Sequence, residues 1–157
     1  MKKLLINLSV VALCSLFFAA CDEYVAYEKT YDLEHDMMLA TNPLVYEFEN
    51  GTDTFQLYDV SLQFTLTPDF ALAQIPIELG YGSSKGKMAI PMAIPVYDKN
   101  KNFLGEVRED ESIVLKQTIL YENRMAEGKN IFTITPGTYN DTIQGLSSVM
   151  VKIEKAN

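Results

Sequence analysis

The stretch that decides the fold runs from Leu44 to Thr67, with the sequence LVYEFENGTDTFQLYDVSLQFTLT. Apolar residues recur at every second position in both of its halves, which is the period of a β-strand with one buried face. The alternation passes through Leu44, Tyr46 and Phe48, and then through Tyr58, Val60, Leu62, Phe64 and Leu66. Asn50-Gly51 lies between the halves and is typical of the positive-φ positions in a tight hairpin. The stretch therefore predicts two strands joined as a β-hairpin.

Alternating or short apolar runs on both sides of this stretch predict further strands. They cover residues 25–33, 71–79, 88–97, 113–121, 130–135 and 147–155. Pro76, Pro91 and Pro95 lack an N–H, so the two segments around the Gly-rich link 80–86 are expected at sheet edges or as irregular extended chain. Segment 113–121 has a composition compatible with a helix, but its weak alternation favours a strand. Seven or eight short strands predict an all-β fold, a single antiparallel β-sandwich or jelly-roll-like domain.

The N-terminus has the pattern of a bacterial lipoprotein signal peptide. Two lysines precede an apolar run, which ends in Phe18-Ala19-Ala20-Cys21 before the polarity changes at Asp22-Glu23. A cysteine directly after small residues is the acceptor of a diacylglyceryl group. We therefore expect residues 1–20 to be removed and Cys21 to become the lipid-modified first residue of a mature domain, 21–157.

Two other interpretations of the N-terminus are weaker. As a transmembrane helix, residues 4–20 would span only about 26 Å, which is short of a hydrocarbon core of about 30 Å. An ordinary secretory signal needs small residues at its cleavage site and has no use for Cys21. The pattern favours a lipoprotein of a bacterial cell envelope, attached to the membrane through acyl chains on Cys21.

Composition limits what the mature domain can do. Removing residues 1–20 leaves 137 of the 157 residues, enough for one domain with its own core. Cys14 leaves with the signal, so Cys21 is the remaining cysteine and no disulfide is expected. Loss of Lys2 and Lys3 changes the formal net charge from −8 to −10. Such acidity argues against nucleic acid as a partner and against attraction to an anionic bilayer by net charge.

One segment has the ligand spacing of a calcium loop. Asp98, Asn100, Asn102 and Glu109 fall at positions 1, 3, 5 and 12 of such a loop. Position 6, where the sharp turn requires Gly, is Phe103, and the flanking segments favour strands instead of helices. A polar hairpin turn at 98–102 explains the segment better, and we predict no metal site.

Two other polar clusters resemble reactive groups. His35, the only histidine, has acidic neighbours, but no second His and no suitable Cys is present to complete a metal site. Arg108-Glu109-Asp110-Glu111 offers adjacent carboxylates, which cannot flank a glycosidic bond as carboxylates on opposed strands do. Both are interpreted as loop residues. We therefore predict no catalytic residues, no cofactor and no enzymatic activity.

Tyrosines concentrate in the N-terminal half of the mature chain. They are Tyr24, Tyr27, Tyr31, Tyr46 and Tyr58. An exposed row of this kind could bind a sugar or a protein partner, whereas packing against a second sheet would give the same alternation. Separately, Asp141-Thr142-Ile143 resembles a short acceptor sequence for O-glycosylation in Bacteroidota, with Thr142 as the acceptor.

Several short motifs, in order along nearly the whole chain, are similar to those of the gliding motility lipoprotein GldH family of Bacteroidota. They are Cys21-Asp22, Tyr31-Asp32, Tyr46-Glu47-Phe48, the Phe55–Tyr58 segment, Phe103-Leu104-Gly105, the Gly128–Ile134 segment, Gly145–Val149 and Lys152–Lys155. The chain differs from the family pattern in lacking Trp, in having Met150 in place of Gly, and in having Lys152 in place of Arg.

This resemblance implies an outer-membrane lipoprotein that acts without enzymatic activity, through protein–protein contacts in the gliding motility or envelope machinery. Its expected partners are the membrane, through lipid on Cys21, and other envelope proteins. The alternative is a surface-exposed module that binds a glycan or another ligand through its tyrosines or proline-rich segments. Whether the domain faces the periplasm or the cell surface is left open.

Overall fold

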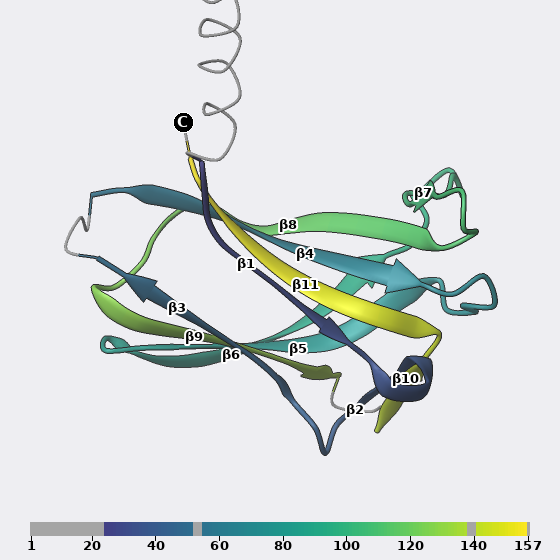
Figure 1. Ribbon diagram of the computed structural model, residues 1–157, viewed down its shortest axis with the longest axis horizontal. Helices are drawn as coiled ribbons and strands as arrows, with labels where there is room; N and C mark the ends of the chain where they lie inside the picture. The colour runs from purple at the N-terminus through teal and green to yellow at the C-terminus, as the bar shows by residue number, and fades with distance from the viewer. Residues whose placement is uncertain (1–23, 52–54, 138–140, 157) are drawn as a thin grey trace, which may run out of the picture.

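The computed structural model describes residues 24–51, 55–137 and 141–156, which form two β-sheets packed face to face (Figure 1). The predicted all-β antiparallel sandwich is confirmed, because every strand pair is antiparallel and the described residues contain only a short 3-10 turn, η1 (Glu34–Asp36), as helix. The predicted signal peptide and Cys21 lie outside these residues. Within them, no helix has the length and apolar character needed to cross a membrane.

The larger layer is a five-stranded sheet. Its spatial order is β1 (Val25–Asp32), β11 (Leu146–Lys155), β4 (Leu57–Leu66), β8 (Ile113–Arg124) and β7 (Glu106–Val107). The second layer is a four-stranded sheet with the order β3 (Leu44–Asn50), β9 (Gly128–Pro136), β5 (Gln74–Ser83) and β6 (Gly86–Pro95). A small third sheet pairs β2 (Met37–Leu39) with β10 (Thr142–Gln144) at the end of the sandwich where β1 finishes (Figure 1).

The predicted strands are all present, including 113–121 as part of β8. The strands that the sequence did not reveal are β2, β7 and β10, which have two or three residues each. A strand of two or three residues is too short to show an alternating pattern in the sequence. These strands form because neighbouring segments hold them in place. The 80–86 link is shorter than expected, because β5 and β6 extend into it and pair as far as Ser83 and Gly86.

The predicted hairpin between β3 and β4 is wrong, although both strands are correct. β3 pairs with β9, while β4 pairs with β11 and β8, so the chain crosses from one sheet to the other between them. Neither Asn50 nor Gly51 has a positive φ. The Asn50 amide is buried instead, where it donates to the carbonyls of Met125 and Ala126 at 3.3 Å and accepts from the Tyr58 hydroxyl at 2.9 Å.

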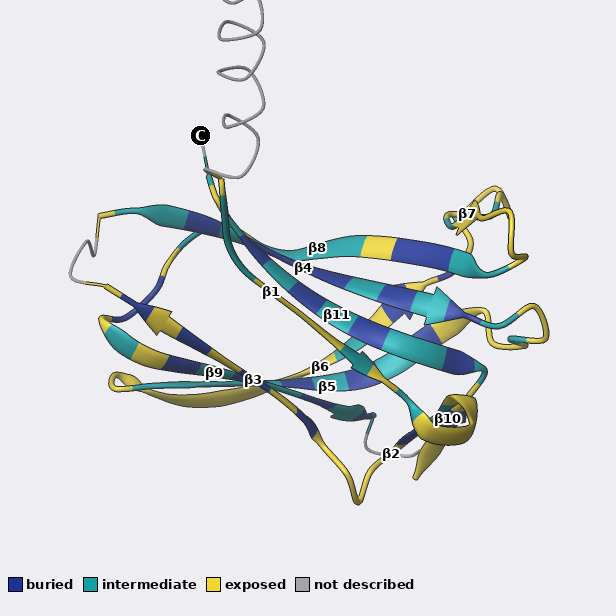
Figure 2. Cartoon of the chain, viewed as in Figure 1, coloured by how far each residue is buried: buried dark blue, intermediate teal, exposed yellow. Residues whose placement is uncertain are grey.

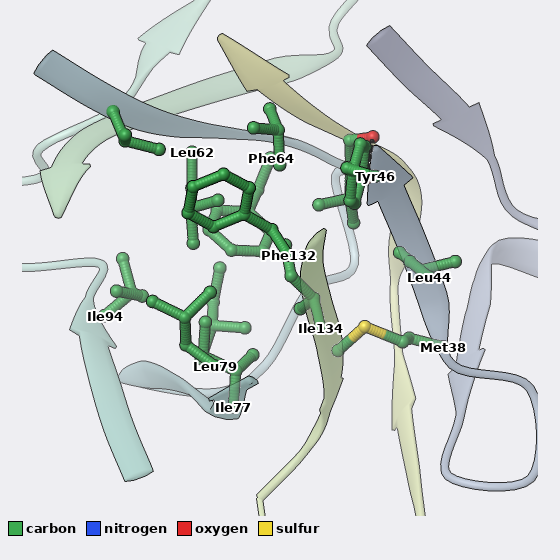
Figure 3. Packing of buried hydrophobic residues seen from close by; sticks show 14 of the residues in the cluster. Met38, Leu44, Tyr46, Leu62, Phe64, Ile77, Leu79, Ile94, Phe132 and Ile134 are labelled. Carbon is green, nitrogen blue, oxygen red and sulfur yellow. Dashed lines mark hydrogen bonds between the residues drawn. The ribbon is translucent and has the colours of Figure 1, made fainter. Parts of the chain in front are cut away.

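Side chains from both sheets fill the core as the alternation predicted. The fully buried residues include Tyr46, Leu62, Phe64, Phe132 and Ile134, each with 0% of its surface exposed. Figure 3 shows the ring of Phe132, from the four-stranded sheet, pointing toward Leu62 and Phe64 of the five-stranded sheet. Each such side chain contributes about 1.5–3 kcal/mol by leaving water, so this core is the main source of stability.

The expectation that both proline-containing segments lie at edges is correct for β6 and wrong for β5, which lies between β9 and β6. Val96 N donates to Ala73 O at 3.0 Å, which makes that pair a hydrogen-bonded one. Bonded and non-bonded pairs alternate along an antiparallel ladder, so Gln74–Pro95, Pro76–Ala93 and Glu78–Pro91 are non-bonded pairs.

This register explains how a central strand contains a proline. The nitrogen of Pro76 faces β9 one residue beyond the end of that pairing, and its carbonyl accepts from Gly137 N at 2.9 Å. The nitrogens of Pro91 and Pro95 face outward on the open edge of β6. Only the reciprocal bond from residue 76 to Gly137 O is lost, at the last pair of the β5–β9 ladder, and Pro91 and Pro95 remove no bond inside the sheet because their nitrogens face its open edge.

Candidate functional site: the exposed strand β6

The predicted tyrosine row does not form an exposed aromatic face. Tyr46 and Tyr58 are buried, Tyr27 and Tyr31 are half-buried, and Tyr24 alone of the five is largely exposed. Three of the hydroxyls are hydrogen-bonded within the fold: Tyr46 donates to Val149 O at 2.8 Å, Tyr31 to Val45 O at 2.7 Å and Tyr58 to Asn50 Oδ1 at 2.9 Å. Packing is therefore the correct one of the two interpretations.

The tyrosines close the edge of the sandwich where β1 lies opposite β3. The ring of Tyr31 meets Tyr46 edge-on at 5.0 Å, and Tyr27 meets Phe48 at 6.1 Å. Lys29 Nζ donates to the Tyr31 hydroxyl at 2.6 Å and lies 4.3 Å from the centre of that ring. This hydrogen bond raises the pKa of Lys29. Edge-to-face aromatic pairs add stability beyond their buried area, so this edge is a structural closure.

The 98–102 segment forms the predicted polar hairpin turn. One carboxylate oxygen of Asp98 accepts from the backbone N–H groups of Asn100 and Asn102 at 2.7 and 2.8 Å, and the other accepts from the Asn102 amide at 2.9 Å. The hydrogen bond from the Asn102 side chain, followed by that from its backbone, lowers the pKa of Asp98. Both oxygens are thus used inside the turn.

Residues 108–111 form an exposed turn of the same kind. Arg108 N donates to Ser112 O at 2.8 Å, and the Ser112 hydroxyl donates to the Asp110 carboxylate at 2.6 Å. This hydroxyl bond is the leading cause of the lowered pKa of Asp110. The carboxylate serves turn geometry, as it does at Asp98.

His35 lies at η1 with a left-handed φ of 56° and is exposed. It lines a shallow depression of about 250 Å³ together with Asp69, whose pKa is lowered by the hydroxyl of Thr67. Among the residues that the structure describes, no three His, Cys, Asp or Glu side chains gather as a metal site would require. Thr142 is exposed on β10, and its modification remains a prediction.

The most unusual surface is β6, which is exposed on both faces (Figure 2). Every residue from Gly86 to Pro91 is exposed. On the face that turns toward the core, Ile94 is buried, but the exposed fraction rises to 37% at Ile90 and 56% at Met88. The five-stranded sheet therefore stops covering β6 toward its start, and apolar side chains that alternate like core residues lie in solvent.

A depression adjoins this strand on the four-stranded sheet. It has a volume of about 190 Å³ and is lined by Gly80, Tyr81, Gly82, Lys87, Met88, Ile131 and Thr133. Gly80 and Gly82 have no side chains to fill the floor of this depression. A Cβ atom at position 80 would lie 3.3 Å from the Cβ of Thr133. We call Lys87, Met88 and Ile90 with this depression the β6 patch, which spans both faces of the strand: Lys87 and the glycine floor lie on the outer face, and Met88 and Ile90 on the face turned toward the core.

Charge at the β6 patch differs from that of the whole chain. In the described part, the ion pairs involve Lys116, Lys129 and Lys152. The ammonium groups of Lys85 and Lys87, beside the β5–β6 turn, thus have no carboxylate partner among the described residues. A mixed basic and apolar surface of this kind is suited to contact with another macromolecule.

Comparisons with known proteins identify no family. No protein-family model matches the chain, and no curated protein does. Among solved structures, the chain is similar to part of dimeric latent PorU from Porphyromonas gingivalis at 9% identity, covering 84% of this chain and 13% of that one with a TM-score of 0.36. It is also similar to part of BuGH86wt in complex with neoagarooctaose at 15% identity, with 80% and 19% covered and a TM-score of 0.33. The chain spans less than a fifth of either structure, and likenesses this distant assign no function.

Proposed function

We propose that this protein is an envelope lipoprotein of the GldH type, attached to the outer membrane through Cys21, which acts as a non-enzymatic assembly module. Its lipid modification, localisation and role in gliding motility rest on the N-terminal pattern and the motif resemblance. The proposed contact with a partner protein rests on one observation: Met88 and Ile90 are exposed on β6, a strand exposed on both of its faces. Folding does not require apolar side chains at exposed positions, so binding is the better explanation for them.

The edge of β6 indicates how a partner would bind. Pro91 and Pro95 remove donors from the outward edge, so strand addition there would lack two ladder hydrogen bonds. Recognition would instead use side chains, with apolar groups meeting Met88 and Ile90 and acidic groups meeting Lys85 and Lys87. An envelope protein surface that curves around the start of β6, apolar on one side of the strand and acidic on the other, fits this description.

Site-specific crosslinking in intact envelopes tests the contact function. A photo-reactive residue at position 88 should give a discrete adduct of constant mass, and the same residue at position 30, exposed on β1, should not. Introducing Ile90→Glu beside the probe should abolish the adduct, because a carboxylate would be desolvated at the interface. Equal adducts at both positions, or none at either, would contradict a β6 interface.

Membrane fractionation tests the lipid anchor independently. The wild-type chain should remain in the outer membrane fraction, and Cys21→Ala should release the domain or leave an uncleaved precursor. Protease digestion of intact cells, with lysed cells as the control, should then show whether the domain faces the cell surface or the periplasm. Identical mass and fractionation of wild type and Cys21→Ala would contradict lipidation.

A further inference from the structure

The end of the five-stranded sheet where the chain enters the fold gathers segments from four strands. Lys155 N donates to Tyr24 O at 2.7 Å, and Ala156 N donates to Leu57 O at 2.9 Å. Leu57 in turn pairs with Arg124 at the end of β8. The start of β1, the end of β11, the start of β4 and the end of β8 therefore lie side by side at this end (Figure 1).

Exposed aromatic side chains concentrate at this end. Four aromatic residues in the described part are largely exposed: Phe55 at 80%, Tyr121 at 69%, Tyr24 at 55% and Tyr97 at 47%. Three of them belong here, since Tyr24 precedes β1, Phe55 lies two residues before β4, and Tyr121 lies three residues before the end of β8. Arg124 and Lys155 are also exposed at the same strand ends.

The fourth aromatic residue, Tyr97, lies at the opposite end. β6 starts near the β8–β9 turn, because Gly82 pairs with Ile131 of β9 and with Lys87 of β6. The strand then runs away from that turn to Pro95, and Tyr97 follows it. Tyr97 and Phe55 are thus exposed aromatic positions at the two ends of one sandwich.

The distance from Cys21 to this end is short. Cys21 and Tyr24 are three residues apart, and three extended residues span at most about 11 Å. A lipid chain on Cys21 would therefore hold Tyr24 within the depth of the headgroup layer or just above it. No other part of the described fold is tied so closely to the anchor.

We propose that this end of the five-stranded sheet, with Tyr24, Phe55, Tyr121, Arg124 and Lys155, lies on the lipid surface and fixes the orientation of the domain. The inference rests on the proposed lipidation of Cys21. Aromatic side chains, and Tyr especially, place an apolar ring and a polar edge at the membrane–water interface, and Arg and Lys reach phosphate groups from there. These aromatic and basic side chains suit the apolar and phosphate groups of a headgroup layer. They also lie at the end of the domain that a lipid on Cys21 would bring to the membrane.

Charge makes this contact different from adsorption to anionic lipid. The proposed contact holds two basic residues, Arg124 and Lys155, in a mature chain whose formal net charge is −10, so it does not depend on a net positive surface. Neutral phosphatidylcholine should suffice, and added salt should have little effect. The β6 patch begins at this same end but belongs to the other layer, about 10 Å away across the core, so a contact confined to the five-stranded sheet would leave it accessible.

The absence of Trp from the chain allows a direct test with the lipidated full-length mature protein in phosphatidylcholine vesicles. Phe55→Trp places a single fluorescent reporter in the proposed contact, and Tyr97→Trp is the matched control at the far end. Both positions are exposed, so both variants should fold. In vesicles with brominated acyl chains, the reporter at 55 should shift to shorter wavelength and lose most of its emission, while the reporter at 97 keeps both properties.

Vesicle flotation separates the possible failures. Protein that fails to float would overturn lipid anchoring and this inference together. Protein that floats while the reporter at 55 remains water-exposed would overturn the inference alone, as would a blue shift that brominated lipid does not quench, which would indicate a second copy or another protein. Equal quenching at 55 and 97 would overturn a fixed orientation. Quenching of a Met88→Trp reporter would instead contradict the free β6 patch of the proposed function.

Discussion

The two long edges of the sandwich are built in opposite ways. Where β1 lies opposite β3, aromatic rings meet edge-on and the Tyr31 hydroxyl links one sheet to the other through Val45 O. At the other edge, β6 extends beyond the covering sheet and exposes Met88 and Ile90. Both edges have alternating apolar residues, but β6 packs only those near its end, such as Ile94, into the core and leaves Ile90 and Met88 exposed. An apolar alternation is thus evidence for a strand and not, by itself, for a buried face.

The largest effect should come from the closed edge. Tyr46→Ala removes a fully buried ring that contacts Tyr31 and a hydroxyl bonded to Val149 O. We expect a loss of about 3–5 kcal/mol in the free energy of unfolding, as for other large aromatic truncations in cores. Denaturant unfolding measures it, with Tyr121→Ala, an exposed ring, as the matched control within about 0.5 kcal/mol. Similar losses for both variants would remove the distinction between buried and exposed tyrosines.

Alkaline pH should weaken the closed edge specifically. Burial, with smaller contributions from Tyr31 and Tyr27, raises the pKa of Tyr46 far above its ordinary value near 10. Above that pH the unfolded chain releases the phenolic proton while the folded chain keeps it. The stabilisation is therefore complete below about pH 10 and falls by about 1.4 kcal/mol per pH unit above it.

Urea unfolding between pH 8 and 11 measures this dependence, and Tyr46→Phe provides the control. The variant should lose about 1 kcal/mol at neutral pH, because Val149 O loses its donor, and should show a shallower alkaline decline. Some decline should remain, since burial also raises the pKa of Tyr27. Parallel curves for the two proteins would show that Tyr46 does not control the alkaline response.

A smaller effect is expected for the hydroxyl that joins the two sheets. Tyr31→Phe removes the bond to Val45 O and the acceptor for Lys29. Because these groups are partly exposed, water replaces much of the lost interaction, and the cost should be about 0.5–1 kcal/mol. Thermal or urea unfolding would detect it. A cost as large as that of Tyr46→Ala would mean that the hydroxyl, and not the rings, closes the edge.

The smallest effect should come from the open edge. Met88→Thr replaces a 56% exposed side chain with a good strand former and should change unfolding free energy by less than about 0.5 kcal/mol. The same change should weaken the β6 crosslink when the photo-reactive residue is moved to position 90. A Met88→Thr variant with a much lower free energy of unfolding would show that Met88 is a core residue. The β6 edge would then be closed in the same way as the β1–β3 edge.

Local sequence pattern predicted most of this fold because each long strand buries one face. It failed at Asn50-Gly51, where turn propensity indicates a hairpin, but the Asn50 amide has buried carbonyls to satisfy on the β8–β9 turn. It failed at Pro76 for a related reason. Whether proline disrupts a central strand depends on the direction of its nitrogen, which is set by the register with a strand distant in sequence.

The candidate surfaces were harder to predict than the fold. Met88, Ile90 and Met92 alternate just as Ile75, Ile77 and Leu79 do on the neighbouring strand, yet only the second set is buried. The difference depends on how far the other sheet extends, and that is a property of the assembled sandwich. Likewise, Tyr24, Phe55 and Tyr121 come together through strand pairing, and no sequence window contains all three.

The strand edges have a consequence if the chain is anchored in a membrane through Cys21 as proposed. A protein confined to a membrane meets copies of itself at an effective concentration far above that in solution, where open strands readily join into fibres. The edges of this sandwich are poorly suited to such joining. β6 lacks donors at Pro91 and Pro95, β3 bears Glu47 and Glu49, β1 bears the exposed Glu28, Lys29 and Asp32, and β7 has two residues. Crowding would therefore leave neighbouring copies as separate units.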